Sequence, residues 1–436
     1  MSKKDKKELV PDLRFSEFKK TEGWAKTKLI NVADKNIKWS FIGGPFGSNL
    51  KSSDYVSKGV RIIQLQNIGD AEFKDKYQIF TSEEKADELL SNNIYPGDII
   101  LSKMGDPVGR ACLIPDAHPR YVMCSDGIRL VVDKSKFSKY FIYILINSDW
   151  FRASVEASAT GSTRKRIGLD VLKKLPLVVP KKIEEQQKIA DCLSSLDELI
   201  TAHVQKHEEL QSYKKGLMQN LFPAEDEALP ALRFSGLHKS WKTKELGRIS
   251  KILRGGSPRP IDEYITSEPS GLNWLKIADV NKKSKYVVST KEKVLVTALS
   301  KTRVVNKGDL IMSNSMSFGR PYILKIKSCI HDGWIAITEI NEKIYRDYLY
   351  YVILSPTSQS YFLNNAAGSG VLNLNADIIK LLPIPFPDHV EQKKIADLLS
   401  SVDDLIAVQG EKIEDLKSHK KGLMQQLFPA MDEVIT

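Results

Sequence analysis

Two stretches of the chain carry apolar residues at three- and four-residue steps, the spacing of one face of an α-helix. They predict long helices over residues 183–223 and 389–429, each closed by Leu-Phe-Pro, where proline forbids further helix. About 40 residues at 1.5 Å each give rods of roughly 60 Å. The recurring apolar positions are Ile189, Leu193, Leu196, Ile200, Leu210, Leu217 and Leu221 in the first stretch and Ile395, Leu399, Val402, Ile406, Ile413, Leu416, Leu423 and Leu427 in the second.

A lone rod of this kind leaves its apolar stripe in water, so we expect the two helices to form an antiparallel coiled coil within the chain. The polar residues His203, His207 and Gln409 fall on or beside the seam. We interpret them as residues that fix the register, with a pH switch through either histidine as the less favoured alternative. Lys214 and Lys215 are expected to lie outside the seam. The predicted seam consists of Leu193, Leu196, Ile200, Leu210, Leu217, Leu399, Val402, Ile406, Ile413, Leu416 and Leu423.

The rest of the chain carries short β-branched runs that are bracketed by turn residues and predict strands. Examples are "GVRIIQLQNI", "GDIILSKM" and "GIRLVVD" before the first long helix and "NWLKIADV" and "GWIAITEI" after it. Amphipathic helices such as "KYFIYILINSDWF" and "RDYLYYVILSPTS" are interspersed. The fold class predicted from this pattern is α+β, with mixed α/β globular domains.

The chain repeats itself at an offset of 206 residues. Glu185–Ile200 aligns without gaps to Glu391–Ile406, and about two-thirds of the positions from Glu185 to Glu227 are identical to their counterparts. Upstream, "PDLRFSEFKKTEGW" resembles "PALRFSGLHKSW", "YPGDIILSKMG" resembles "NKGDLIMSNSM", and "CSDGIRLVV" resembles "IHDGWIAIT". The helices are similar and the globular parts have diverged, which is expected of two copies that recognise different partners.

The repeat predicts an internal pseudo-twofold organisation of two globular domains and two helical regions. The predicted boundaries are 1–182 and 224–388 for the domains, 183–223 and 389–429 for the helical regions, and 430–436 for a C-terminal tail.

Composition narrows the class of protein. The chain has 436 residues and a formal net charge of +11, which favours polyanionic partners such as nucleic acid. No apolar run is long enough to span a bilayer and no apolar core follows the basic N-terminus, so we expect a cytoplasmic protein that does not bind membranes. The four cysteines form no CxxC pair, and we interpret them as reduced thiols without a metal.

The motifs of most enzyme classes are missing. The sequence has no GxxxxGK[ST] loop, no GxSxG elbow, no HExxH helix and no Asn/Asp-Pro-Pro-aromatic tetrapeptide of amino-methyltransferases. The glycine-rich stretches "FIGGPFGSNL" and "LRGGSPRP" are interrupted by proline, so we interpret them as turns that bring backbone close to a ligand. We therefore predict a binding protein without catalytic residues and without a metal or cofactor of its own.

Polar side chains in the predicted loops of both domains are suited to DNA. Glutamine and asparagine amides can read adenine edges, and a loop that carries arginine and lysine can lie against phosphates or enter a groove. A single arginine or glutamine is more often solvated surface, and Trp334 is more often core than a base-stacking platform, so only the set favours DNA. The candidate DNA-binding residues are Ser48, Lys51, Arg61, Gln64, Gln66, Asn67, Lys103, Arg164, Lys165, Arg166, Arg254, Arg259, Lys276, Asn281, Ser313, Asn314, Ser315 and Arg320.

The motifs "GGPFGSNLKSSDY", "GVRIIQLQNIGD", "GLNWLKIADV", "HDGW" and "KKGLMQ(N/Q)LFP" together resemble the specificity subunit of type I restriction-modification systems, and the resemblance covers essentially the whole chain. It implies two target recognition domains, each reading one half of a bipartite, asymmetric site in double-stranded DNA, separated by helical regions that set the spacer. It also implies two methyltransferase subunits that use S-adenosylmethionine for adenine-N6 methylation. Restriction subunits, which use ATP and Mg²⁺, would join the complex of methyltransferase and specificity subunits.

Two other readings stay open. A self-contained DNA methyltransferase or nuclease with disguised motifs would be active as the purified chain. An adaptor that uses its helical repeats to bind proteins would show no salt-dependent affinity for DNA.

Overall fold

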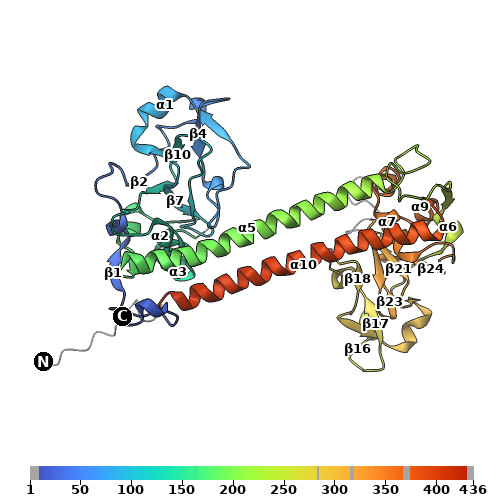
Figure 1. Cartoon of the computed structure of the whole chain (residues 1–436). Coiled ribbons are helices and arrows are strands. Elements are labelled where there is room, and N and C mark those ends of the chain that lie inside the picture. The colour runs from blue at the N-terminus through green and yellow to red at the C-terminus, as the bar shows by residue number, and fades with distance from the viewer. Residues whose placement is uncertain (1–8, 163, 282–283, 315–318, 367–373, 430–436) are drawn as a thin grey trace. The chain divides into compact units, whose positions relative to one another are not determined.

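The computed structural model describes residues 9–162, 164–281, 284–314, 319–366 and 374–429, and the predicted tail, 430–436, lies outside them. The chain divides into two compact units, one made of Met1–Ala202 with Ile413–Thr436 and the other of His203–Lys412. Each unit holds one globular domain and one segment from each of two long helices, α5 (Ile183–Asn220) and α10 (His389–Leu427) (Figure 1). We call the globular part before α5 domain 1 and the part between α5 and α10 domain 2.

Domain 1 combines two packed sheets with helices. A four-stranded sheet of order β2-β11-β7-β9 packs on a five-stranded sheet of order β3-β5-β4-β10-β6, and the pairs β1-β13 and β12-β8 complete the domain. Its strands are β1 (Ala25–Lys28), β2 (Phe41–Gly43), β3 (Tyr55–Val56), β4 (Val60–Ile63), β5 (Ile79–Thr81), β6 (Asn93–Ile94), β7 (Ile99–Ser102), β8 (Met104–Gly105), β9 (Ala111–Leu113), β10 (Tyr121–Met123), β11 (Gly127–Leu130), β12 (Lys165–Arg166) and β13 (Pro176–Val179). Its helices are α1 (Glu83–Glu88), α2 (Lys139–Ile146), α3 (Asp149–Ser158) and α4 (Leu169–Lys174).

The strand β7 is buried on both faces. Ile99 and Leu101 belong to a core that they share with the helix α2, whereas Ile100 packs between the two sheets with Ile63. A strand covered on both faces does not need to alternate apolar and polar residues, which explains the consecutive apolar residues "IIL" in the sequence.

Domain 2 repeats this architecture. Its sheets have the orders β15-β24-β21-β22-β18 and β16-β19-β17-β23-β20, with the flanking pair β14-β25, so the predicted α+β fold and internal repeat are confirmed. Its strands are β14 (Lys242–Glu245), β15 (Lys251–Arg254), β16 (Ile265–Thr266), β17 (Leu272–Leu275), β18 (Tyr286–Val287), β19 (Glu292–Val294), β20 (Arg303–Val305), β21 (Leu310–Ser313), β22 (Pro321–Leu324), β23 (Ser328–Ile330), β24 (Trp334–Thr338) and β25 (Pro383–Phe386). Its helices are α6 (Leu246–Ile249), α7 (Arg346–Leu354), α8 (Pro356–Asn365) and α9 (Ala376–Lys380).

Each unit contains an antiparallel pair of helix segments. In the first unit, Leu193 near the start of α5 shares a core with Leu427 at the end of α10. In the second unit, Leu217 near the end of α5 shares a core with Leu399 near the start of α10. The early part of each helix therefore packs on the late part of the other, which confirms the antiparallel coiled coil (Figure 1). Among the other predicted seam residues, Val402, Ile413 and Leu416 are buried and Leu196, Ile200, Leu210, Ile406 and Leu423 are half-buried.

The lysines of "KKGLMQ" differ from the prediction. The Lys214 ammonium pairs with Asp403 of the other helix at 2.5 Å, and its repeat counterpart Lys420 pairs with Asp197 at the same distance. The expectation that Lys214 lies outside the helix interface is therefore wrong, because its four-carbon stem reaches along the apolar seam to a carboxylate on its far edge. Lys215 is exposed, as expected.

A polar layer lies at the midpoint of the helix pair. The Gln409 Nε2 atom donates a hydrogen bond to the His203 carbonyl oxygen at 2.8 Å and lies 2.6 Å from the His203 Nδ1 atom. These residues are 206 positions apart and are thus counterparts in the repeat. Counterparts of an antiparallel pair meet only at its centre, so the contact marks the local twofold axis of the helices. That this layer fixes the register remains a prediction.

Buried polar pairs fix the start of each long helix to its own domain. Glu185 in α5 accepts two hydrogen bonds from the Arg14 guanidinium, at 2.7 and 2.8 Å, and Glu391 in α10 accepts two from Arg233, at 2.9 and 2.7 Å. The residues from "LRF" and "EQ" therefore meet twice, which explains why the sequence repeats both motifs.

The neighbouring glutamines join each long helix to a helix of the domain. The Oε1 atom of Gln186 accepts from the backbone N–H of Ser138, the N-cap of α2. The Oε1 atom of Gln392 accepts from the backbone N–H of Tyr345, the N-cap of α7. Each amide thereby satisfies an N–H group at a helix start that has no partner within the helix.

The Leu-Phe-Pro ends of the helices are exchanged between the two halves of the chain. Phe428 packs in the core of domain 1, with ring centroids 6.0 Å from Trp24 and 5.6 Å from Phe141. Phe222 packs in the core of domain 2, 5.8 Å from the ring of Tyr348. The end of α10 therefore completes the core of domain 1, and the end of α5 completes the core of domain 2.

We expect Glu185→Ala to lower the free energy of unfolding of the first unit by about 3 to 5 kcal/mol, because it leaves the buried Arg14 guanidinium without its carboxylate. Glu184→Ala removes an exposed carboxylate from the same helical turn and serves as the control. Urea denaturation monitored by tryptophan fluorescence measures both. Equal losses in the two variants would contradict a structural role for the buried pair.

Candidate nucleic-acid interface

Three segments of domain 1 meet at one corner of its two sheets: the loop after β2, the start of the 3-10 helix η4 (Leu65–Asn67) and the turn between β10 and β11. The Gly44 backbone N–H donates to the Gly127 carbonyl oxygen at 2.7 Å. A Cβ atom at Gly44 would lie 1.7 Å from the Cys124 carbonyl oxygen, so no other residue fits at this close approach. The glycine thus ties the loop to the turn.

Domain 2 builds the same corner from the loop after β15, the start of η7 (Ile277–Asp279) and the turn between β23 and β24. The Gly255 N–H donates to the Trp334 carbonyl oxygen at 2.8 Å, and a Cβ atom at Gly255 would lie 2.1 Å from the His331 carbonyl oxygen. Gln64 precedes η4 in domain 1, and Lys276 precedes η7 in domain 2. The backbone is therefore repeated while the side chains differ.

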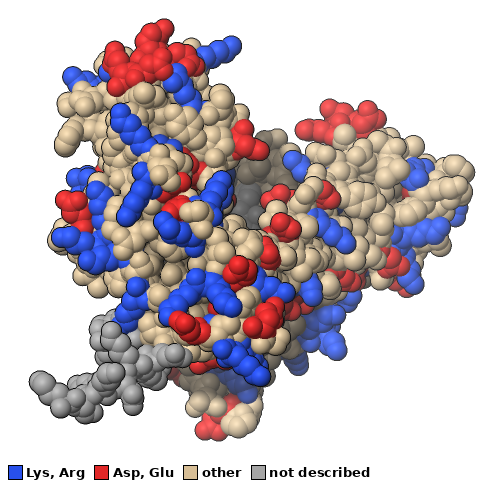
Figure 2. All heavy atoms as spheres, turned by 60° about the vertical axis from the view of Figure 1, so that its left-hand side comes forward, with Lys and Arg blue, Asp and Glu red and all other residues tan. Residues whose placement is uncertain are grey.

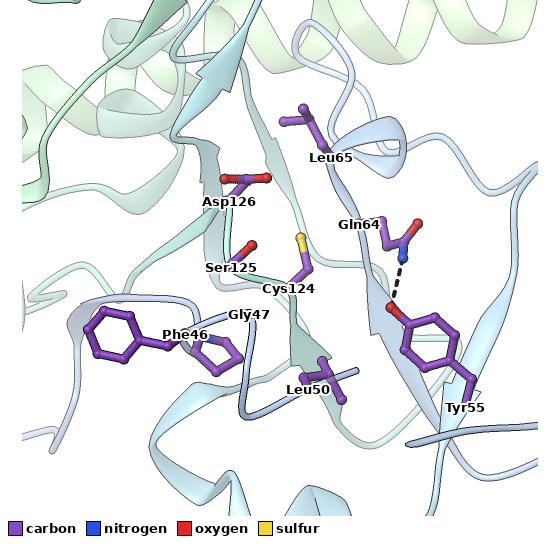
Figure 3. A pocket seen from close by; sticks show the side chains of 10 residues that line it. Phe46, Gly47, Leu50, Tyr55, Gln64, Leu65, Cys124, Ser125 and Asp126 are labelled. Carbon is purple, nitrogen blue, oxygen red and sulfur yellow. Dashed lines mark hydrogen bonds between the residues drawn. The ribbon is translucent and has the colours of Figure 1, made fainter. Parts of the chain in front are cut away.

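In domain 1 the corner encloses a pocket of about 280 Å³ with a polar centre (Figure 3). The Gln64 Nε2 atom donates to the Tyr55 hydroxyl at 3.3 Å, and the Gln66 Nε2 atom donates to the Gln64 Oε1 atom at 3.1 Å. The Asp126 carboxylate accepts a hydrogen bond from the Arg166 guanidinium at 2.9 Å. The lining residues are Pro45, Phe46, Gly47, Leu50, Tyr55, Gln64, Leu65, Cys124, Ser125 and Asp126.

In domain 2 the corner carries two arginines beside Asp332 of the turn between β23 and β24. Arg254 donates to the Asp332 carbonyl oxygen at 3.2 Å, and the Arg259 guanidinium lies 3.8 Å from the Asp332 carboxylate. Burial alone raises the pKa of Asp332, but the Ser257 hydrogen bond and the charges of His331 and Arg254 outweigh it and hold the pKa below its ordinary value. Asp332 is therefore ionised at neutral pH, and its negative charge attracts the nearby Arg259 guanidinium.

The structure brings some predicted DNA-binding residues to these corners. Gln64 lines the pocket, and Arg166 reaches it through Asp126. The Lys103 backbone N–H donates to the Asp126 carbonyl oxygen at 2.7 Å. Others are exposed near the corner segments in sequence. Ser48 and Lys51 in domain 1 and Arg259 and Asn281 in domain 2 lie in loops, Gln66 lies in η4, and Arg254 ends β15.

Two residues of the run "RIIQLQN" are structural, contrary to the prediction. Arg61 is 1% exposed in the central part of a sheet and donates to the Asp75 carboxylate at 2.7 Å. Asn67 is 1% exposed and donates to the Tyr77 carbonyl oxygen at 2.9 Å. Both side chains hold the segment after η4 in place, so their assignment as base-reading residues is wrong.

The serine and asparagine that end β21 are also buried. Ser313 is fully buried, and the Asn314 side chain donates to the Asp332 carbonyl oxygen at 3.3 Å. They support the turn of domain 2 from behind and do not face solvent, which corrects their predicted role. Ser315 lies outside the described residues.

Some of the remaining predicted DNA-binding residues already contact other side chains of the chain. Lys165 pairs with Glu156, and Lys276 pairs with Glu292. Arg320 is half-buried and lies over the ring of Tyr322 at 5.6 Å. Arg164 is exposed in the loop before β12.

Several corner residues were missed from the sequence. Phe46 is 82% exposed at the tip of the glycine-rich loop, and Asp126 and Asp332 occupy the same place in the two turns. The signal for the aspartates was present, because "SDG" and "HDG" are the only similar part of otherwise different turns. Phe46 carries no such signal, because phenylalanine is usually a core residue and has no hydrogen-bonding group.

Charge is distributed unevenly over domain 1. Figure 2 shows a group of acidic side chains at its upper end, over α1, where Glu83, Glu84, Asp87 and Glu88 are exposed. Phosphates are repelled from this end of the domain.

Among the described residues, no three or more His, Cys, Asp or Glu side chains are grouped as a metal site would require. Within the same part of the chain, no helix has the length and apolar character needed to cross a bilayer.

Comparison with known proteins finds the same kind of protein in a family model and among individual relatives. The model of the family described as "Type I restriction modification DNA specificity domain" matches residues 56–212 and 238–418. The chain is 25% identical to the "Putative type I restriction enzyme MjaX specificity subunit" of Methanocaldococcus jannaschii over 87% of its length and 88% of that protein. It is 23% identical to the type I restriction enzyme MjaVIII specificity subunit of the same organism, over 66% and 69% of the two chains.

Two solved structures share the fold. The S subunit of a type I restriction-modification system from M. genitalium superposes with a TM-score of 0.58 at 17% identity, covering 97% of this chain and all of that one. A chain from a structure on the assembly and conformational transition of a type I R-M system also gives 0.58, at 16% identity over 94% and 98% of the two chains.

Proposed function

Since the chain belongs to the family of type I restriction-modification DNA specificity domains, we propose that domain 1 and domain 2 each read one half of a bipartite, asymmetric DNA site. The observation that supports this proposal is the corner that both domains form from equivalent segments. The same backbone, closed by Gly44 and Gly255, presents an aromatic and amides in domain 1 and guanidinium groups in domain 2. Such a pair of sites is suited to two different base sequences, because base edges are read by the donors and acceptors that a loop presents.

In this proposal the chain itself has no catalytic role. Adenine methylation and restriction are carried out by partner subunits, which hold S-adenosylmethionine, ATP and Mg²⁺. The chain alone, with S-adenosylmethionine or Mg²⁺ and DNA, is then inactive.

The test is long-read methylome sequencing of cells that carry the methyltransferase partner with and without this chain. We expect one bipartite motif that is methylated only when both are present. An unchanged set of methylated motifs would refute the proposal. The purified chain should also bind DNA with an affinity that falls steeply as salt rises, which separates it from a protein-only adaptor.

The long helices are proposed to dock two methyltransferase subunits. Leu199 and its counterpart Leu405 are 42% and 55% exposed, and among the residues that the structure describes no atom would lie within 4 Å of a Cβ atom added at Gly216 or Gly422, apart from their own neighbours in the helix. A glycine inside a helix costs about 1 kcal/mol relative to alanine, so its occurrence at both positions suits a close approach by another protein. Two similar surfaces fit two copies of one partner.

Leu199→Glu should remove one bound methyltransferase subunit, and Leu199→Glu with Leu405→Glu should remove both, because a buried unpaired carboxylate disfavours the contact. Native mass spectrometry of the co-expressed complex counts the subunits. Glu198→Lys, one position away and exposed, is the control. A double variant that retains both subunits would place the docking surface elsewhere.

The helices are also proposed to set the distance between the half-sites. Seven residues inserted after Ala202 and seven after Val408 keep the apolar repeat and lengthen both helices by about 10 Å. We expect the spacer of the methylated motif to grow by about three base pairs while both half-sites stay unchanged. An unchanged spacer in the methylome would contradict this role.

A further inference from the structure

We propose that the corner of domain 1 reads an A·T base pair, with Gln64 contacting adenine and Phe46 the thymine methyl group, whereas Arg259 at the corner of domain 2 reads guanine. This inference rests on the proposed function and assigns base identity to residues of its two sites. It starts from the different chemistry that one repeated loop presents in the two domains.

The loop of domain 1 exposes an aromatic ring. Phe46 is 82% exposed, although an aromatic side chain of this size gains free energy by burial. It lies two residues after Gly44, which fixes the loop to the turn at Cys124. The rigid base of the loop therefore holds an uncovered apolar group at the edge of the pocket, where a ligand with an apolar group would cover it.

The same pocket holds an amide that can exchange its partners. Gln64 is half-buried, and its side chain forms hydrogen bonds of 3.3 Å to the Tyr55 hydroxyl and 3.1 Å from Gln66. A hydrogen bond between neutral groups contributes only about 1 kcal/mol, so a ligand can replace these bonds. A glutamine amide pairs with the N6 and N7 atoms of adenine in the major groove.

One base pair satisfies both groups. The major-groove edge of an A·T pair presents the adenine N6 and N7 atoms together with the thymine 5-methyl group. Phe46 and Gln64 line one pocket on either side of Cys124 and Ser125 (Figure 3). These two groups therefore favour an A·T pair at this pocket.

The corner of domain 2 has the opposite character. The Arg259 side chain is 83% exposed in the loop that Gly255 fixes, and it lies 3.8 Å from the Asp332 carboxylate, beyond hydrogen-bond distance. Its guanidinium retains its donors for another acceptor. Arginine binds the O6 and N7 atoms of guanine with two parallel hydrogen bonds.

The test uses the complex of this chain with its methyltransferase subunits and duplexes that carry the methylated motif. Each thymine of the half-site assigned to domain 1 is replaced in turn by uracil, which lacks only the methyl group. At one position, the wild-type complex should bind the uracil duplex about four-fold more weakly, as expected for loss of one buried methyl group.

The variant Phe46→Ala should bind the thymine and uracil duplexes equally, whereas Phe46→Leu should still prefer thymine. Gln64→Ala should weaken binding on the order of ten-fold and relax the choice of the adenine paired with that thymine. Arg259→Ala should keep the thymine preference and relax a guanine in the other half-site. Matching melting curves establish that the exposed substitutions leave the fold intact.

The outcomes separate the inference from the function on which it rests. If the wild-type complex shows no preference for the motif over unrelated DNA, the proposed function fails. If it prefers the motif but no uracil replacement weakens binding, or if Phe46→Ala keeps the thymine preference, the function stands and the assignment of the A·T pair is overturned.

Discussion

A chain truncated after Pro230 is expected to form a homodimer that replaces the missing half with a second copy of itself. In the full chain, Leu423, Met424 and Leu427 of α10 and Phe428 just after it complete the core of domain 1. Residues 207–223 carry the same "KKGLMQ" and "LFP" motifs and can occupy that place in a second copy. Lys214 of one copy would then pair with Asp197 of the other, as Lys420 does in the full chain.

Analytical ultracentrifugation should show a dimer at micromolar concentration, and Lys214→Glu should weaken it, whereas Lys215→Glu on the exposed face should not. With methyltransferase subunits, the dimer should direct methylation to a palindrome made of two copies of one half-site. A soluble monomer with a cooperative melting transition would show instead that domain 1 does not need the exchanged helix end.

The second large effect concerns specificity. Exchanging residues 25–180 for those of a related specificity subunit should change one half of the methylated motif completely and leave the other half intact. The boundaries follow from the fold, because β1 pairs with β13 inside the exchanged segment and Arg14 pairs with Glu185 outside it.

The incoming domain must retain a tyrosine at position 140, whose hydroxyl donates to Asp197 of α5 at 2.8 Å. Exchange of residues 242–387 is the reciprocal experiment, with the Tyr351 hydroxyl bonded to Asp403 as the contact to preserve. Methylome sequencing reads both results. A single exchange that alters both half-sites would refute the assignment of one domain to one half-site.

Much of the fold could be predicted because its signals are local. The apolar spacing predicted two helices, and α5 begins at Ile183 and α10 at His389. The repeat predicted two similar domains, and both contain two sheets with matching strand orders apart from the additional strand β18. Each of these properties depends on neighbours within a few residues or on comparison of the chain with itself.

The site was less predictable because burial depends on distant contacts. Arg61 lies in a run that was predicted to form a strand, but only its pairing with Asp75 in the folded domain reveals that its side chain has a structural role. Phe46 is the opposite case. Phenylalanine is usually a buried core residue, and only the folded structure shows that this one is exposed in its loop. The contact of Lys214 was likewise not predictable from its neighbours in sequence, because its partner Asp403 lies on the other helix.

The exchange of the Leu-Phe-Pro ends has a consequence for synthesis of the protein. Trp24 packs against Phe428, so the core of domain 1 stays incomplete until residue 428 has left the ribosome. At 5 to 20 residues per second, this delay after residue 182 lasts about 12 to 50 seconds. During that time the nascent first domain exposes apolar surface, and chaperones or an early methyltransferase contact become more important for its yield than for that of domain 2.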